Sequence, residues 1–409
     1  FKLGNSYYSL KLSGTGTWTP SSNLTVAGTL TNSNILAMGN NNLQVNIGLS
    51  NSGTITTTGN GSNLIIDSGI TSIGGTVSFT SAAASGLPNK TYTTLNLANG
   101  GTIDGGSVTV TTLNVTGGTL TIGGAAGSGT LNINTSANID GILAFNTAIG
   151  TSNLNINNAT VNYSGATLDF TNCDLFDTDY GSTFVFDGTT NLTSVTDVSN
   201  FDTVRVNNGG SLTLYGDDLN ATSLVIGQGA SGILNNNDLQ IWVSSGTVLV
   251  NTGATLNISG SFASGPIWCE DFTSSGTINY LTAGGQASLR IGGSCTLSGN
   301  FDTDISVVMQ SAQGETIDSS VALGVLAIWS GTDEATKIVN HPLTVSELQL
   351  GHNSGDIGVL DTNGQKLTIT DDIAMYSAGS KLTVKSSTLD INCDIVIPSG
   401  FTLELTGTN

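Results

Sequence analysis

The chain has 409 residues, of which 54 are glycine and 9% are charged, and 29 acidic against 9 basic residues give a formal charge of −20 at pH 7. This charge repels a phosphate backbone, whose binding depends on clustered cations, so the composition argues against nucleic-acid binding. The apolar residues occur in pairs and triplets rather than in runs of about 18 or more, and the sequence therefore predicts no transmembrane segment.

The residue types favour strands and turns over helices. β-Branched side chains suit a pleated surface, and Gly and Asn tolerate the positive φ of tight turns. No stretch places good helix formers at 3.6-residue spacing over three turns. We therefore expect an all-β fold with little or no α-helix.

A short unit recurs along the chain, in which two apolar residues, separated by one polar residue, follow a small or polar one. The two apolar side chains of each unit point to one side of a strand, and Thr, Asn or Ser point to the other. The clearest copies, in chain order, are residues 118–122, 129–133, 166–170, 210–214, 254–258, 366–369, 381–384, 388–391 and 401–405.

These units are shorter than the strands of an ordinary antiparallel sandwich, which are usually about five or six residues long. Short strands separated by Gly and Asn corners favour a parallel β-helix, or β-solenoid, in which each turn of about 18–25 residues stacks on the next. In such a coil Leu and Ile form internal ladders, and Asn bridges neighbouring corners. We expect one elongated solenoid over residues 1–409, with a candidate irregular excursion at 301–342 and final turns at 343–409.

The phrases Gly-Thr-Leu-Thr-Ile at 118–122 and Gly-Ala-Thr-Leu-Asn-Ile-Ser-Gly at 253–260 resemble the passenger regions of bacterial autotransporters and related β-helix adhesins. The resemblance covers most of the chain. It implies a secreted, extracellular protein at the cell surface that acts in adhesion or aggregation. A glycan or another cell-surface ligand is a candidate partner.

The expected function is that of a non-enzymatic structural or adhesive protein. The first and last segments both alternate like strands, and an open strand edge is a template for pairing with another chain. We expect identical subunits to associate end to end through their terminal strands into a fibre. The alternative is that flanking sequence supplies caps for these edges.

A polysaccharide-cleaving β-helix enzyme is the main alternative function. A lyase needs a carboxylate-binding cation, and the chain has only two arginines, Arg205 and Arg290. A hydrolase needs two carboxylates at a defined separation. The candidate pairs are adjacent in sequence, and adjacent residues of a strand face opposite sides. They are Asp217 with Asp218, Glu270 with Asp271, Asp333 with Glu334, and Asp371 with Asp372.

One acidic cluster has the hard oxygen ligands that calcium prefers. It consists of Asp174, Asp177, Asp179 and Asp187, and the alternative is a solvated acidic corner. No other cofactor is expected. The two histidines, His341 and His352, are not spaced as zinc ligands and are interpreted as isolated polar loop residues.

Four cysteines are too few to cross-link a solenoid of this size. Cys269 and Cys295 are 26 residues apart, near one turn, a spacing that allows them to stack as neighbours. Cys173 and Cys393 are many turns apart, beyond the reach of a disulfide, and are expected to be buried as small apolar side chains.

Threonine pairs suggest a second alternative, an ice-binding solenoid with a flat threonine array. The pairs are Thr56 with Thr58, Thr109 with Thr111, and Thr119 with Thr121.

Overall fold

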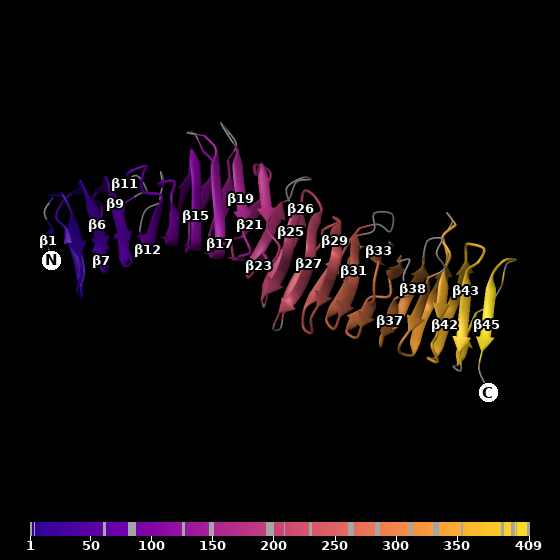
Figure 1. Ribbon diagram of the computed structural model, residues 1–409. Helices are drawn as coiled ribbons and strands as arrows, with labels where there is room; N and C mark the ends of the chain where they lie inside the picture. Colours follow the sequence, from indigo (N-terminus) through magenta and orange to yellow (C-terminus); the bar gives the residue numbers. More distant parts are fainter. Residues whose placement is uncertain are drawn as a thin grey trace. The chain divides into compact units, whose positions relative to one another are not determined.

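The structure is a computed structural model of the whole chain (Figure 1). It describes residues 2–3, 5–59, 63–80, 87–124, 127–146, 151–193, 200–207, 209–228, 231–260, 266–282, 287–310, 314–329, 335–352, 355–385, 388–393, 397 and 399–406, without the side chains of Lys2, Leu3 and Ser244. The described residues form strands and turns and contain no α-helix. The predicted all-β class is therefore confirmed.

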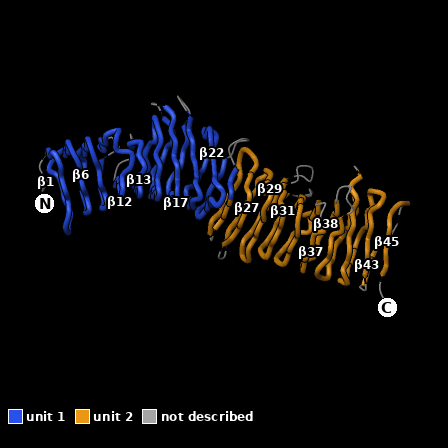
Figure 2. The backbone as a smooth tube through the Cα atoms, in the orientation of Figure 1, with its two compact units in different colours: residues 1–202 blue, residues 203–409 orange. Residues whose placement is uncertain are grey.

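The chain divides into two compact units, residues 1–202 and 203–409 (Figure 2). The strands of unit 1 are β1 (Lys2–Leu3), β2 (Ser6–Tyr7), β3 (Leu10–Leu12), β4 (Thr17–Pro20), β5 (Leu24–Val26), β6 (Thr29–Asn32), β7 (Ile35–Ala37), β8 (Leu43–Val45), β9 (Gly48–Asn51), β10 (Thr54–Thr57), β11 (Leu64–Ile66), β12 (Ser72–Phe79), β13 (Thr91–Leu97), β14 (Gly100–Ile103), β15 (Gly106–Val115), β16 (Thr119–Ile122), β17 (Gly129–Ile139), β18 (Ile142–Phe145), β19 (Ser152–Ile156), β20 (Thr160–Tyr163), β21 (Thr167–Asp169), β22 (Leu175–Thr178), β23 (Thr183–Phe186) and β24 (Thr189–Thr193).

Strand β25 (Asn200–Asn207) contains the boundary between the units. The strands of unit 2 that follow it are β26 (Gly210–Tyr215), β27 (Leu219–Gln228), β28 (Gly232–Asn235), β29 (Ile241–Val250), β30 (Thr255–Ile258), β31 (Ile267–Ser274), β32 (Thr277–Tyr280), β33 (Ala287–Ile291), β34 (Cys295–Leu297), β35 (Asn300–Phe301), β36 (Ile305–Met309), β37 (Thr316–Ser319), β38 (Leu323–Ile328), β39 (Thr336–Val339), β40 (Leu343–Leu350), β41 (Val359–Asp361), β42 (Leu367–Met375), β43 (Lys381–Lys385), β44 (Leu389–Ile391) and β45 (Thr402–Thr406).

Each unit is a parallel β-solenoid, as predicted. In unit 1 the two halves of the long strand β17 pair in parallel with β19 and β20, while β16, β18 and β21 stack on a third side. In unit 2 β31 pairs with β33 and β34 in the same way, and β28, β30 and β32 form the third side. Stacked asparagines in one ladder of unit 1 are 18 and 24 residues apart along the chain, which agrees with the predicted turn length.

The sequence unit at residues 118–122 forms a turn and a strand, as predicted. Gly118 has a φ of +68°, and a Cβ atom there would lie 2.2 Å from the carbonyl oxygen of Asn99. Only glycine fits this turn without strain, because L-residues rarely adopt a positive φ and backbone occupies the space. Strand β16 begins at the next residue, and its two apolar side chains, Leu120 and Ile122, are fully buried.

The interior consists of apolar ladders, one side chain above another in successive coils. One ladder of unit 1 contains Leu95, Leu113, Ala137, Val161 and Phe184, which are paired in register and at most 1% exposed. Burying a large aliphatic side chain contributes about 1.5–3 kcal/mol, so a continuous column of them stabilises the coil although each strand is short.

An aromatic cluster fills the last coils of unit 1. The ring of Phe170 lies 5.3 Å from Phe145, 4.8 Å from Phe176 and 6.2 Å from Phe201, measured between ring centroids. Tyr163 packs beside this cluster, and burial raises the pKa of its hydroxyl to about 12. Large rings therefore take the place of aliphatic side chains in these coils.

Asparagine ladders run along the outer surface of the strands. In unit 1 the amide Nδ2 of Asn138 donates to Oδ1 of Asn114 over 3.0 Å, and Asn162 donates to Asn138 over 2.8 Å. In unit 2 Asn257 and Asn279 continue the same pattern over 2.7 and 3.0 Å. The prediction placed bridging asparagines at the corners, but these ladders lie within strands, because the outward positions of parallel strands also stack in register.

A separate asparagine pair does occupy a buried corner. Asn32 is fully buried, and its Nδ2 donates to Oδ1 of Asn51 over 2.8 Å and to the carbonyl oxygen of Thr54 over 3.2 Å. These bonds satisfy polar groups that water cannot reach.

The candidate excursion at 301–342 contains β36, β37, β38 and β39, which pair in parallel with their neighbours.

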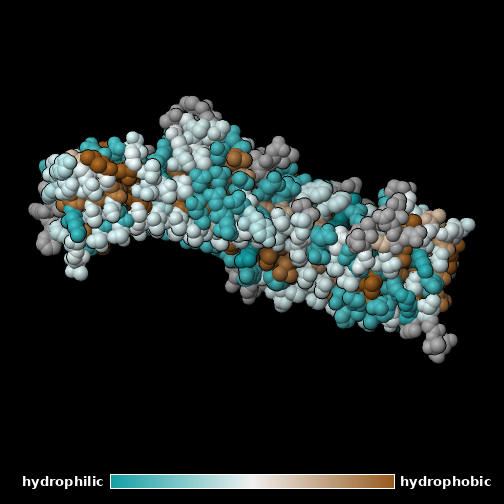
Figure 3. All heavy atoms as spheres, in the orientation of Figure 1, coloured by the Kyte–Doolittle hydropathy of each residue, from teal (hydrophilic) through white to brown (hydrophobic). Residues whose placement is uncertain are grey.

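The face in Figure 3 is mainly hydrophilic or intermediate in hydropathy, and hydrophobic side chains appear as small separate patches. Within the described ranges no helix has the length and apolar character needed to cross a membrane.

Candidate functional site

A pair of stacked tryptophans lies on the outer face of unit 2. Trp242 in β29 and Trp268 in β31 are paired in register, and their ring centroids are 4.8 Å apart with an interplanar angle of 16°. Their neighbours in sequence, Val243 and Cys269, point inward and are buried. Alternation along the strand therefore forces both indoles outward, where stacked rings gain stability beyond the area that they bury.

Arg290 extends this stack by one coil. It is the register partner of Trp268, and its guanidinium carbon lies 4.5 Å from the centroid of that ring. The same carbon is 5.8 Å from the ring of Trp329, which in turn lies 4.5 Å from the ring of His352. Two of the four tryptophans of the chain therefore contact one of its two arginines, and a third, Trp242, stacks on Trp268. We call Trp242, Trp268, Arg290 and Trp329 the Trp–Arg cluster.

Trp329 also anchors the cluster to the sheet. It is 8% exposed and packs with Val308 and Ala327, two buried residues of neighbouring strands. Val308 is the register partner of Arg290, so this apolar patch continues the outward column of the tryptophans. The packing fixes the position of the indole that faces Arg290.

A pocket of about 360 Å³ opens beside the cluster. Its walls are Trp242, Val243, Trp268, Cys269, Glu270, Arg290, Gly292 and Gln310. The indole N–H of Trp268 and the Nε–H of Arg290 are buried and have no acceptor in the described part of the chain. Burial also lowers the pKa of the guanidinium of Arg290. Buried donors without acceptors are costly in a folded protein, so the chain holds these two groups at an energetic cost.

One acidic residue of this pocket, Glu270, also acts on a buried lysine. Glu270 lines the pocket, and a Cβ atom on Gly292 would lie 2.7 Å from the Glu270 carboxylate, so the glycine leaves room for that side chain. Lys337 in β39 is fully buried. Desolvation lowers its pKa to about 8, although the charges of Glu315 and Glu270 act in the opposite direction.

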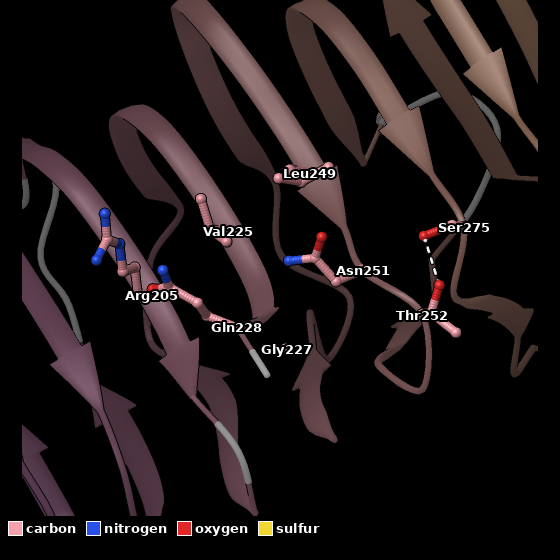
Figure 4. Close-up of a pocket in the computed structure, with 8 residues that line it drawn as sticks. All are labelled: Arg205, Val225, Gly227, Gln228, Leu249, Asn251, Thr252 and Ser275. Atoms are coloured by element: carbon pink, nitrogen blue, oxygen red, sulfur yellow. Dashed lines mark hydrogen bonds between the residues drawn. The ribbon is translucent and has the colours of Figure 1, made fainter. Parts of the chain in front are cut away.

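The other arginine lines a second, more polar pocket of about 520 Å³ (Figure 4). Arg205, Val225 and Leu249 come from β25, β27 and β29, and the hydroxyl of Thr252 donates to that of Ser275 over 3.0 Å. The Nε of Arg205 is buried without an acceptor among the described residues. This pocket has a cation but no aromatic ring, so it lacks the apolar wall on which a ligand ring would pack.

The adjacent acids do not all face opposite sides, so that part of the prediction is wrong. Asp371 and Asp372 are both exposed and line the same pocket, and Glu270 and Asp271 both avoid the interior. Register shifts in β29 and β40, opposite these residues, mark irregular bends where simple alternation fails. Of the other two pairs, Asp217 and Asp218 are both half-buried. Asp333 and Glu334 lie outside the described residues.

The candidate calcium ligands Asp174, Asp177, Asp179 and Asp187 are all exposed. One carboxylate oxygen of Asp174 accepts a hydrogen bond from the backbone N–H of Ser152 over 2.7 Å. In the described part of the chain no three acidic, histidine or cysteine side chains form a group that could hold a metal ion. Calcium binding by these four residues stays a prediction, which calorimetric titration with millimolar calcium tests.

The histidines have specific partners. His341 Nδ1 lies 2.5 Å from a carboxylate oxygen of Asp318. The ring of His352 is tilted against that of Trp329 at an interplanar angle of 44°, and its Nδ1 lies 3.9 Å from the carboxylate of Asp356. Their interpretation as isolated loop residues is therefore wrong, since each one contacts another side chain that the chain folds next to it.

All four cysteines are free thiols. Cys173 is 4% exposed, as predicted, whereas Cys393 is only half-buried, so its predicted burial is incomplete. Cys269 and Cys295 lie on different ladders, in register with Ile291 and with Phe272. The two thiols do not share a ladder, because the bend of β31 places them on two sides of the coil.

Sequence reasoning did not find the Trp–Arg cluster. The available signal was that Trp242 and Trp268 occupy the same position in two similar segments, Ile-Trp-Val and Ile-Trp-Cys. Aligning these segments as successive coils places the indoles together, and it places Arg290 in the next coil.

Comparison of the chain with protein-family models, with curated proteins and with solved structures gives no match. The class of the protein is defined by its fold alone, which is the parallel β-solenoid.

Proposed function

We propose that this chain is an extracellular structural or adhesive protein of the cell surface that binds saccharide chains at the Trp–Arg cluster. The observation that carries the proposal is the stack of Trp242 on Trp268, held 4.8 Å apart on the outer face beside a pocket. Outward, register-matched tryptophans do not contribute to the core. A binding role accounts for their exposure.

The chemistry of the pocket suits a hydroxylated ring. Binding sites for small molecules combine apolar and aromatic walls with a few fixed polar groups that orient the ligand. Here Trp242 and Trp268 supply aromatic surface, Gln310 and Glu270 supply hydrogen-bonding groups, and Arg290 supplies a cation. A sugar offers both kinds of surface, since its C–H face is apolar and its hydroxyls are polar.

Glycan binding by the full chain, measured on an array of surface polysaccharides, tests this proposal. The Trp268→Ala substitution is expected to abolish binding, and Trp242→Ala to weaken it. Trp18→Ala is the matched control, because Trp18 is a half-buried tryptophan of β4 in unit 1, outside the cluster. Equal binding by wild type and Trp268→Ala would refute the proposed site.

End-to-end association through the terminal strands remains part of the proposed role. β45 pairs in parallel with β43 on one side over Thr402–Thr406. Adding a strand to its other side would use the main-chain hydrogen bonds that extend any ladder. Negative-stain images of the complete mature protein that show only short monomers would contradict the fibre.

Ice binding is a second candidate, favoured by one observation in unit 1. Thr54, Thr76, Thr94 and Thr112 lie in register on four successive strands and point outward. The threonine array therefore runs across coils rather than along the Thr-x-Thr pairs of the sequence. A thermal hysteresis assay that gives zero would eliminate this candidate.

A further inference from the structure

The guanidinium of Arg290 is fixed in place but is not neutralised. Trp268 and Trp329 hold it by cation–π contacts, at 4.5 and 5.8 Å from their ring centroids. Across the described ranges, ion pairs involve lysines and histidines with acidic residues, and none involves Arg290. Glu270 lines the same pocket without forming such a pair. An arginine in this state is preorganised for an acceptor that the chain does not supply.

The geometry of the donor group selects the acceptor. A guanidinium presents N–H groups in a planar fork, which matches the two oxygens of a carboxylate better than a single hydroxyl. The Nε–H of Arg290 is buried and has no acceptor in the described part of the chain, and the same is true of the indole N–H of Trp268. The side chains of Arg290 and Trp268 both line the pocket, so one ligand can contact both, with its carboxylate against the part of the half-buried guanidinium that is not covered.

The charge of the chain limits the ligand further. A formal charge of −20 repels a polyanion over about a Debye length, roughly 8 Å at physiological salt. The net negative charge of the chain repels a single carboxylate, paired directly with Arg290, much less than it repels a dense row of carboxylates. The stacked indoles beside it require a ring, and Gln310 and Glu270 suit its hydroxyls.

From these observations we propose that the Trp–Arg cluster binds an acidic sugar, a pyranose ring of the hexuronic acid class, with its carboxylate on Arg290 and its ring against Trp268. This inference rests on the proposed saccharide binding and names the ligand class of the same site. It assigns a specificity role to Arg290, whereas the tryptophans provide the affinity common to acidic and neutral sugars.

The chain offers a direct readout, because it contains only two arginines. In protein labelled with ¹⁵N-arginine, the Nε–H region of an NMR spectrum contains one signal from each, and Arg205→Gln and Arg290→Gln assign them. The probes are disaccharides that end in glucuronate or galacturonate, together with the same disaccharides that end in glucose or galactose. Each pair differs only in the carboxylate.

We expect the acidic probes to shift the Arg290 signal and to bind about tenfold more tightly than the neutral ones, a difference of about 1.4 kcal/mol. Arg290→Gln should remove this preference, so that acidic and neutral probes bind equally, and Arg290→Lys should restore part of it, since the charge remains without the fork. Arg205→Gln, the matched control, should change nothing. Thermal melting of each variant confirms that it is folded.

The outcomes separate the two proposals. Equal binding of acidic and neutral probes would overturn the assignment of an acidic sugar, while saccharide binding would stand. A preference that survives Arg290→Gln but is lost in Arg205→Gln would move the site to the pocket of Figure 4 and overturn it as well. Failure of every probe and of the glycan array to bind would overturn both proposals.

Discussion

The guanidinium of Arg290 lies over the indole of Trp268, 4.5 Å from the ring centroid, and the two residues are register partners in adjacent strands. On its other register side, Trp268 stacks on Trp242. The order of the three side chains is set by the coil itself, because parallel strands in register place outward residues directly above one another.

The first prediction concerns the energy of this stack. An aromatic pair contributes about 0.5–1.5 kcal/mol beyond burial, so a double-mutant cycle of Trp242→Ala and Trp268→Ala should give a coupling energy of about 1 kcal/mol. Urea denaturation of the four proteins measures it. Strict additivity of the two single changes would show that the rings do not stack in solution.

The second prediction compares two asparagines in unit 1. Asn138→Ala removes an exposed ladder side chain whose partners remain open to water, and it should cost at most about 1 kcal/mol of unfolding free energy. Asn32→Ala leaves buried groups of Asn51 and Thr54 without a partner and should cost about 1–3 kcal/mol more. Chemical denaturation checks the order, and equal costs would contradict it.

The third prediction concerns the aromatic cluster of unit 1. Phe170→Ala removes a fully buried ring that contacts three others, and it should destabilise the protein by about 3–5 kcal/mol. Tyr180→Ala is the control, since Tyr180 is 91% exposed and its loss should change stability by less than about 0.5 kcal/mol. A thermal scan of the two variants distinguishes them, and a small effect of Phe170→Ala would argue against the packed interior.

The fourth prediction follows from Lys337. Its pKa is about 8 in the folded chain against an ordinary value of 10.5, so between these values the unfolded chain binds more protons. The contribution of this residue to the unfolding free energy therefore rises as the pH increases from about 8 to about 10.5. Below about pH 8 the lysine is charged in both states, and the full cost of burying that charge lowers the stability of the folded chain.

Lys337→Met should remove this rise and stabilise the protein most at pH 7, as measured by denaturation at several pH values. Lys366→Met is the control, because Lys366 pairs with Asp390 at an exposed site. The pH profiles of Lys337→Met and wild type would coincide in shape if Lys337 kept an ordinary pKa.

The fifth prediction concerns the thiols. Burial raises the pKa of Cys173 and of Cys295 to about 12, and it raises the pKa of Cys269 well above its ordinary value. Only the thiolate reacts with alkylating reagents, so native protein should be labelled first at the half-buried Cys393. Mass spectrometry after brief iodoacetamide treatment identifies the site. Rapid native labelling of Cys269 would contradict its burial.

Much of the fold could be predicted from local patterns. The unit at 118–122 became β16, and the unit at 129–133 begins β17, because a glycine turn followed by alternating apolar residues specifies both a corner and an inward face. The parallel coil followed from how short these units are. Bends could not be predicted in the same way, since at Asp371 and Asp372 a register shift cancels the alternation on which the prediction depended.

The candidate site was beyond sequence reasoning for a related physical reason. Trp268 contacts Trp242 and Arg290 only because the register of β29, β31 and β33 aligns them. Coils differ in length, so no fixed period links these positions. Cys269 and Cys295 show the same limit: their separation is close to one turn, yet the bend of β31 places them on different sides.

The asparagine ladder of unit 1 shows how the chain accommodates such differences. Asn96 and Asn114 are 18 residues apart and Asn114 and Asn138 are 24 apart, yet consecutive members remain hydrogen-bonded at 2.8 and 3.0 Å. Most of the additional length enters between β16 and β17, away from the ladder. An insertion at this corner therefore leaves the hydrogen bonds between stacked asparagines intact, so successive coils can differ in length without breaking the ladder.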